Sequence, residues 1–247
     1  MWAKLAGSFN KDFFLNCNSM KEMRRIAYGP DIGDLDANEE NLRELQELLK
    51  GVEHISCRGT APLNVLEQCT DKKIQPVLDP TLLIGRHEYD SIASDRLIDE
   101  PYVLYYYIEN NPDMRRQAQE FAKKNNLKLV ELTSRLSKNN IFRTSEINYS
   151  FGIQEFVSLI KYSECVFTDS FHGICVSIQY KKNFYAYPRK KEKKVFDLCQ
   201  MVGTSERYMI NKSFEDVSQD TIDYEKVDQL LDDWRKTSID WLKDALS

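Results

Sequence analysis

Short apolar runs typical of strands alternate with helix-like segments from about residue 23 to the end of the chain. This alternation predicts an α/β fold with a mainly parallel sheet. The predicted strands cover residues 25–29, 54–57, 75–78, 102–108, 127–132, 165–168, 184–187 and 208–210. The predicted helices cover residues 38–50, 62–69, 89–93, 112–125, a stretch after Gly152, 172–180, 195–202 and 224–246.

A polar segment over residues 95–100 ends in Pro101 and predicts a domain boundary. We expect a partial N-terminal Rossmann-like domain (1–98), a C-terminal Rossmann-like domain (99–222) and a C-terminal helix (223–247) that packs back towards the N-terminal domain. A Rossmann-like half needs more strands than the three predicted before residue 80. The N-terminal unit is therefore expected to be incomplete, and the chain to be a fragment.

Composition excludes several classes of function. The 247 residues are 42% hydrophobic, which suffices for a core, and the formal net charge of -5 argues against wholesale nucleic-acid binding. No apolar run approaches the roughly 20 residues that span a bilayer. The first residues do not resemble a signal peptide. We expect a cytoplasmic protein without a transmembrane segment.

The cysteines and histidines argue against a metal site. The six cysteines are scattered without a C-x-x-C pair, and four lie in predicted strands or helices. Reduced thiols in the core are the expected state, because a free cysteine packs as a small apolar residue and the cytosol disfavours disulfides. The three histidines show no paired ligand spacing, so no structural zinc is expected.

Residues 165–173 predict a strand that passes through a polar turn into a helix. The carboxyl ends of parallel strands form ligand sites, and the N–H groups of the next helix attract anions. An unperturbed imidazole titrates near neutral pH, so His172 is a candidate proton donor or, alternatively, a packed and hydrogen-bonded side chain. Asp169 either orients this imidazole or caps the helix together with Ser170.

Other strand ends carry charge as well. Arg58 either grips a carboxylate or phosphate or is an ordinary surface arginine. Asp79 is expected to stabilise a turn. The basic run 189–194 is either a solvated helix face or an attractor for an anionic donor. The acidic run 31–40 is interpreted as the approach to a helix.

Taken in order, these strand ends resemble the polysaccharide pyruvyl transferase family. The resemblance rests on residues 25–29, 55–59, 77–83, 102–106, 154–160 and 166–173. It implies a glycosyltransferase-B-like fold whose active site lies between two Rossmann-like halves. Two departures stand out: the family's first strands are absent before Met1, and Gly59 stands where many relatives have an acidic residue.

The resemblance also implies a reaction. Members transfer the pyruvyl group of phosphoenolpyruvate to two hydroxyls of a saccharide, free or lipid-linked, as a ketal in cell-surface polysaccharides. His172 would bind the donor and deliver a proton, and Arg58 would grip the donor. The remaining expected substrate-binding residues are Ser170, Asp169, Gly173, Arg189 and Lys193. No metal or organic cofactor is implied.

Two alternatives remain open. A nucleotide-sugar glycosyltransferase of similar fold would need a nucleotide pocket with an acidic residue for the ribose. A truncated, inactive homologue with a binding role would expose apolar surface and self-associate.

Overall fold

The computed structural model describes residues 2, 4–5, 7–15, 23–33, 35–133, 152–189, 193–217 and 221–247. The chain forms two compact units. The first unit contains Met1–Leu83, Lys191–Met201 and Asp228–Ser247, and the second contains Ile84–Lys190 and Val202–Val227.

The second unit is built on a parallel four-stranded sheet of order β7-β6-β8-β9. In register, Val103 lies opposite Leu129 on one neighbouring strand and Cys165 on the other. The strands are β6 (Tyr102–Tyr107), β7 (Lys128–Thr133), β8 (Cys165–Thr168) and β9 (Asn183–Ala186). Together with the first unit's sheet, this confirms the predicted α/β class with parallel sheets.

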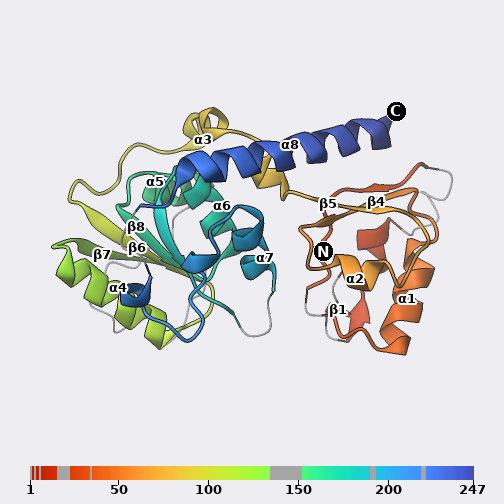
Figure 1. The fold of residues 1–247 in the computed structure, drawn as a ribbon, viewed down its shortest axis with the longest axis horizontal. Helices are drawn as coiled ribbons and strands as arrows, with labels where there is room; N and C mark the ends of the chain where they lie inside the picture. Colours follow the sequence, from red (N-terminus) through yellow and green to blue (C-terminus); the bar gives the residue numbers. More distant parts are fainter. Residues whose placement is uncertain are drawn as a thin grey trace. The chain divides into compact units, whose positions relative to one another are not determined.

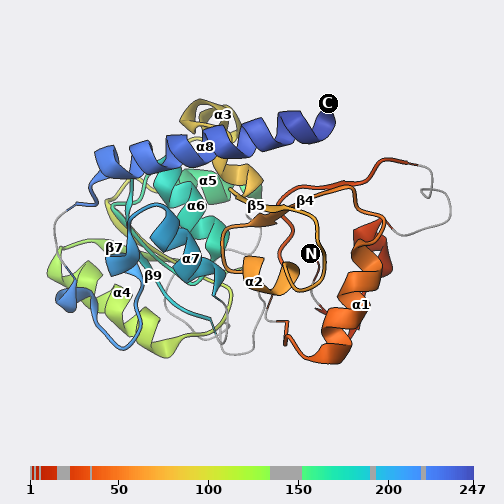
Figure 2. The ribbon, with the colours of Figure 1, turned by 45° about the vertical axis from the view of Figure 1, so that its right-hand side comes forward.

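Helices cover both faces of this sheet (Figure 1 and Figure 2). Successive side chains of a strand point to opposite faces. Val103, Tyr105 and Tyr107 of β6 form a buried cluster with residues of α4 (Pro112–Lys124). On the other face the Tyr102 hydroxyl donates to a carbonyl of α5 (Ile153–Lys161). Beside α5 lie α3 (Arg86–Ile92) and α6 (Phe171–Gln179).

The first unit has a parallel three-stranded sheet of order β3-β4-β5. The strands are β3 (Ile26–Ala27), β4 (His54–Arg58) and β5 (Ile74–Val77). Pro76 lies in the edge strand β5, where a residue without a backbone N–H donor is tolerated. The first residues add an antiparallel hairpin, β1 (Lys4–Leu5) with β2 (Ser8–Phe9), and the 3-10 helix η1 (Lys11–Phe14).

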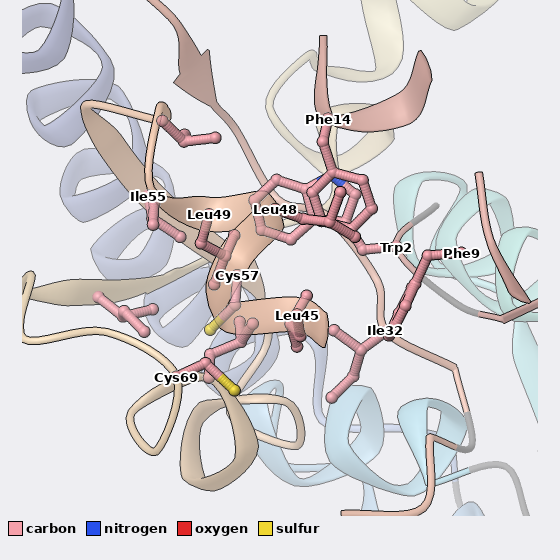
Figure 3. Close-up of a cluster of buried hydrophobic side chains, with 13 residues drawn as sticks. Trp2, Phe9, Phe14, Ile32, Leu45, Leu48, Leu49, Ile55, Cys57 and Cys69 are labelled. Carbon is pink, nitrogen blue, oxygen red and sulfur yellow. The ribbon is translucent and has the colours of Figure 1, made fainter. Parts of the chain in front are cut away.

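The core of the first unit gathers around α1 (Glu39–Leu49) (Figure 3). Asn38 caps this helix by accepting a hydrogen bond from the Asn41 N–H at 3.0 Å. Trp2 stacks on Phe14 with ring centroids 4.8 Å apart. The cluster includes Trp2, Phe9, Phe14, Ile32, Leu45, Leu48, Leu49, Ile55, Cys57 and Cys69.

Two later segments complete the first unit. One contains α7 (Lys194–Met201), and the other holds all but the first residues of α8 (Tyr224–Leu246). The Leu78 N–H donates to the Ser238 hydroxyl of α8 at 2.9 Å, and Arg235 Nε donates to the Leu82 carbonyl at 2.8 Å. Other short elements are α2 (Leu63–Leu66), η3 (Pro80–Leu82), η5 (Ser205–Arg207) and η6 (Phe214–Asp216).

The structure differs from the sequence-based expectations in one strand and in the division into units, where residues 191–201, expected in the C-terminal domain, belong to the first unit. The predicted strand 208–210 is wrong: η5 is followed by a single bridge between Ala186 and Tyr208. Ile210 is 53% exposed, because the chain turns away from the sheet there. The second unit begins at Ile84 rather than near residue 98, because α3 contacts α5.

Five cysteines, at positions 57, 69, 165, 175 and 199, are buried free thiols, as predicted. Cys17 lies outside the described residues. Burial raises the pKa of the Cys57 thiol to about 12, and the nearby Asp197 and Glu67 contribute to that rise, so this thiol stays protonated. Among the described helices, none combines the length and apolar character needed to cross a bilayer.

Candidate functional site

Three adjacent strand ends of the first unit bring three charged side chains together, and α7 adds a fourth. Arg58 is the last residue of β4, and the neighbouring β3 and β5 lead into Asp31 and Asp79. Arg58 Nη1 donates to Asp79 Oδ2 at 2.7 Å, and Nη2 donates to Asp31 Oδ2. Lys194 of α7 lies 3.5 Å from Asp31. We call these four residues the strand-end cluster.

Both carboxylates are held by their own turns. Asp79 Oδ1 accepts from the Thr81 N–H at 2.9 Å and from the Thr81 hydroxyl at 2.7 Å. Asp31 Oδ1 accepts from the Gly33 N–H at 2.8 Å. In each carboxylate one oxygen is bound by the turn and the other faces Arg58. The predicted turn-stabilising role of Asp79 is confirmed, and an ion pair adds to it.

Asp31, Asp79 and Arg58 stay charged at neutral pH. Burial works to raise the pKa of Asp31 and of Asp79, but the Arg58 charge and the hydrogen bonds outweigh it, so both pKa values lie below the ordinary value of 3.8. The Asp31 and Asp79 side chains are only 9% and 4% exposed, and that of Arg58 is 17% exposed. Such buried charges are stable only as pairs.

A pocket of about 370 Å³ opens at this cluster within the first unit. Asp31, Arg58, Lys193 and Lys194 supply its polar wall. The remaining lining residues are Ile32, Gly33, Leu35, Ala61, Pro62 and Val65. Arg58 and Asp31 also line a neighbouring pocket of about 330 Å³ that includes Trp2, Arg25 and Tyr28. An apolar cavity with a few converging charges is the usual form of a small-molecule site.

Asp197 of α7 holds the turn that follows Arg58. Its carboxylate accepts from the N–H groups of Thr60 at 2.8 Å and Ala61 at 3.2 Å, and from the Thr60 hydroxyl. Gly59 has a φ of +69°, and a Cβ built there would lie 2.0 Å from Asp197 Oδ2. Glycine at position 59 therefore has a physical reason: an acidic side chain would collide with Asp197.

The predicted strand–turn–helix of residues 165–173 is present in the second unit as β8 and α6. Ser170 is the N-cap of α6 and accepts from the Gly173 N–H at 3.2 Å. Asp169 instead reaches the end of β6, where it accepts from the N–H groups of Ile108 at 2.7 Å and Glu109 at 2.9 Å. Of the predicted alternatives, capping thus belongs to Ser170, and Asp169 fixes the neighbouring loop.

Gly173 lets α6 start close to the sheet. A Cβ at this position would lie 2.8 Å from Thr168 Oγ1 and 3.0 Å from Tyr106 Cδ1. His172, in the first turn of the same helix, is exposed, and its ring lies edge-on to Phe171 with centroids 5.6 Å apart. The imidazole is therefore accessible at a helix N-terminus, where anions are favoured.

Arg189 acts on the same turn. Burial raises the pKa of Asp169, while the Ile108 and Glu109 N–H groups and the Arg189 charge counter that rise. The positive charge of Arg189 thus favours the ionised form of Asp169. Residues 190–192 of the predicted basic run lie outside the described residues.

The seven predicted site residues divide between the units. Arg58 and Lys193 belong to the first unit and share its 370 Å³ pocket. The other five belong to the second unit and surround the turn between β8 and α6: Asp169, Ser170, His172, Gly173 and Arg189.

Two carboxylates of the first unit escape the sequence-based prediction. Asp31 is interpreted from the sequence as part of the acidic segment that precedes a helix. In the structure, Glu39 and Glu40 are the acidic residues in the first turn of α1. The signal for Asp31 is its place after a predicted strand, beside the strand that ends at Arg58. Asp197 gives no local signal, because its partner Thr60 is 137 residues away. Asp34 lies outside the described residues.

Chemically, the first unit offers a paired guanidinium and two lysines at a pocket. The second unit offers an accessible imidazole at a helix N-terminus. Such groups suit a small anionic ligand and a proton transfer. Within the described residues, no group of three or more His, Cys, Asp or Glu side chains could hold a metal ion.

Polar side chains lie at the carboxyl ends of parallel strands, the place where α/β proteins commonly bind their ligands. The polysaccharide pyruvyl transferase family model matches residues 5–191, and the chain belongs to that family. No curated protein matches the sequence. A solved structure, the dodecameric iron-containing heptosyltransferase TibC in complex with ADP-D-beta-D-heptose, is similar at 11% identity over 91% of this chain and 78% of that chain, with a TM-score of 0.36.

Proposed function

We propose that this protein transfers the pyruvyl group of phosphoenolpyruvate to two hydroxyls of a saccharide, free or lipid-linked, in the cytoplasmic assembly of a cell-surface polysaccharide. The observation that carries the proposal is the family match over residues 5–191. The accessible imidazole of His172 and the paired guanidinium of Arg58 supply the acid and the cation that this chemistry requires.

Phosphoenolpyruvate and the saccharide together give the ketal and inorganic phosphate. A proton adds to the methylene carbon of phosphoenolpyruvate, which becomes the methyl group and leaves a cationic centre at C2. One sugar hydroxyl attacks C2, and the C2–O bond to phosphate breaks. A second hydroxyl then closes the ketal. The two hydroxyls lose two protons, of which one restores the acid and the other leaves with phosphate.

Each site residue has a role in this proposal. His172 binds the donor and delivers the proton, because an imidazole titrates near neutral pH. Arg58 holds the donor's carboxylate or phosphate, assisted by Lys193. In the second unit Arg189 adds positive charge, while Asp169, Ser170 and Gly173 shape the turn that presents His172 and the N–H groups of α6.

The direct test is incubation of the purified protein with phosphoenolpyruvate and a saccharide panel. Ketal is detected by mass spectrometry, and phosphate release is measured in parallel. His172→Ala should lower kcat by about a hundredfold or more, the usual contribution of a general acid. His87→Ala is the matched control, because the His87 side chain is 95% exposed and lies on α3. Near wild-type turnover in both His172→Ala and Arg58→Ala would refute the assignment.

Thermal shift tests the donor without an acceptor. Phosphoenolpyruvate at about 100 times its Kd should stabilise the protein by about 2.7 kcal/mol. A shift with nucleotide sugars and none with phosphoenolpyruvate would instead indicate a glycosyltransferase.

A further inference from the structure

We propose that Asp31 and Asp79 are positioning residues that hold the Arg58 guanidinium in one orientation on the wall of the 370 Å³ pocket. The inference rests on the proposed function for the identity of the anion that Arg58 meets. The holding itself follows from the hydrogen bonds of the first unit alone.

The Arg58 guanidinium is held at both of its terminal nitrogens. The two terminal nitrogens of Arg58 donate to two carboxylates that come from opposite neighbours in the sheet, one after β3 and one after β5. A guanidinium bound at both amino groups cannot rotate about its Cζ–Nε bond without breaking one of these bonds. Because β4 lies between β3 and β5, the sheet order itself places Arg58 between its partners.

The two carboxylates are themselves fixed. Their Oδ1 atoms are bound by the turns at Gly33 and at Thr81, so each Oδ2 atom has a set position. Supporting hydrogen bonds of this kind place a binding group before the ligand arrives. An arginine held in advance loses less side-chain entropy on binding a ligand.

The charges around Arg58 also balance. Arg58 and Lys194 balance Asp31 and Asp79 within the strand-end cluster, and Lys193 adds a positive charge to the pocket wall. The carboxylates therefore fix the guanidinium without making the pocket wall negative.

The experiment begins with Asp79→Asn. Asparagine keeps an Oδ1 acceptor for Thr81, so the turn survives, but it removes the negative charge that faces Arg58. We expect the Kd for phosphoenolpyruvate to rise about tenfold, the scale of one charge-assisted hydrogen bond. Asp31→Asn, which keeps the acceptor for Gly33, should act in the same direction.

A matched control separates positioning from mere stability. Glu131→Gln breaks another buried pair, Glu131 with Arg115, in the second unit. It should lower Tm as Asp79→Asn does but leave the Kd for phosphoenolpyruvate unchanged. If Asp79→Asn behaves like this control, Asp79 is only structural and the inference is wrong.

A double-mutant cycle adds a second criterion. Once Arg58→Met has removed the guanidinium, Asp79→Asn should weaken phosphoenolpyruvate binding no further. Losses that multiply in the double variant would show that Asp79 acts independently of Arg58, which overturns the inference.

Side-chain NMR of Arg58 tests the grip without any ligand. Restricted rotation about Cζ–Nε should give two resolved Nη signals in the wild type, and these should merge in Asp79→Asn. Merged signals in the wild type would overturn the inference. If the wild type forms no ketal and binds no phosphoenolpyruvate, the proposed function fails, while the Nη signals still decide whether the carboxylates hold Arg58.

Discussion

At the scale of single residues, the charge on each group in the first unit depends on its neighbours. Arg58 would be costly to bury alone, and Asp31 and Asp79 make its burial possible. The same carboxylates keep low pKa values because Arg58 lies between them. The three side chains therefore function as one unit, and removing Arg58 would take the shared cation from both buried carboxylates.

This dependence predicts a pH effect on stability. Both carboxyl pKa values are depressed in the folded protein. The ion pairs therefore contribute their full stabilisation above the unfolded-state pKa of about 3.9, and this stabilisation is lost as the pH falls through the pKa values of the folded protein. Asp79→Asn should cost roughly 3 kcal/mol at pH 7. The difference in unfolding free energy between wild type and variant should shrink below about pH 4. Chemical denaturation at a series of pH values measures it, and a constant difference would contradict the prediction.

A second residue-scale prediction concerns Gly59. Gly59→Ala should destabilise the protein by more than the roughly 1–2 kcal/mol of a left-handed alanine, because the new Cβ also collides with Asp197. Gly7→Ala is the control, since Gly7 has a φ of +88° but a Cβ added there would meet nothing within 4 Å. Equal losses in Tm for the two variants would show that the Asp197 contact is unimportant.

At the scale of elements, local patterns predict most strands and helices. The leucine face of α1 and the polar turn between β8 and α6 are visible in the sequence, because each depends on neighbours a few residues apart. The predicted strand 208–210 fails because an apolar triplet does not show whether a sheet edge will pair with it.

The candidate site is predictable only in part. The residues at strand ends can be named from the sequence, since parallel strands end at one edge. Which of these residues pair with one another cannot be predicted from the sequence. The pairing of Arg58 with Asp31 and that of Thr60 with Asp197 depend on sheet order and on segments far apart in the chain. The capping role of Ser170 follows from its place before α6, whereas the reach of Asp169 to Ile108 depends on the pairing of β6 with β8.

An element-scale prediction follows for α6. Ser170→Ala removes the N-cap and should cost about 1 kcal/mol. Ser170→Asp should retain stability, because aspartate accepts the same hydrogen bond and its charge suits the helix N-terminus. Thermal unfolding of the two variants checks this. Equal losses would argue that burial at this position outweighs capping.

At the scale of the whole molecule, the first unit draws on three separate parts of the chain. All three tryptophans, at positions 2, 234 and 241, belong to it, so tryptophan fluorescence reports on this unit alone. The Trp241 ring lies 6.0 Å from that of Tyr28, and Ser238 binds the end of β5. The late segment therefore takes part in the packing of the early one.

Removal of residues 228–247 should accordingly unfold or loosen the first unit. The emission of Trp2, which is 3% exposed, should shift to longer wavelength. Amide protons of β6 to β9 in the second unit should keep their protection against hydrogen exchange. An unchanged Trp2 emission would show that the first unit does not need α8.

The three-part construction of the first unit also bears on synthesis in the cell. A ribosome adds roughly 5–20 residues per second, so tens of seconds can separate the emergence of β4 from that of α8. During that interval the nascent N-terminal segment lacks both Asp197 and Ser238 as partners. We therefore expect the second unit to mature first and the first unit to complete its packing only after α8 has been synthesised.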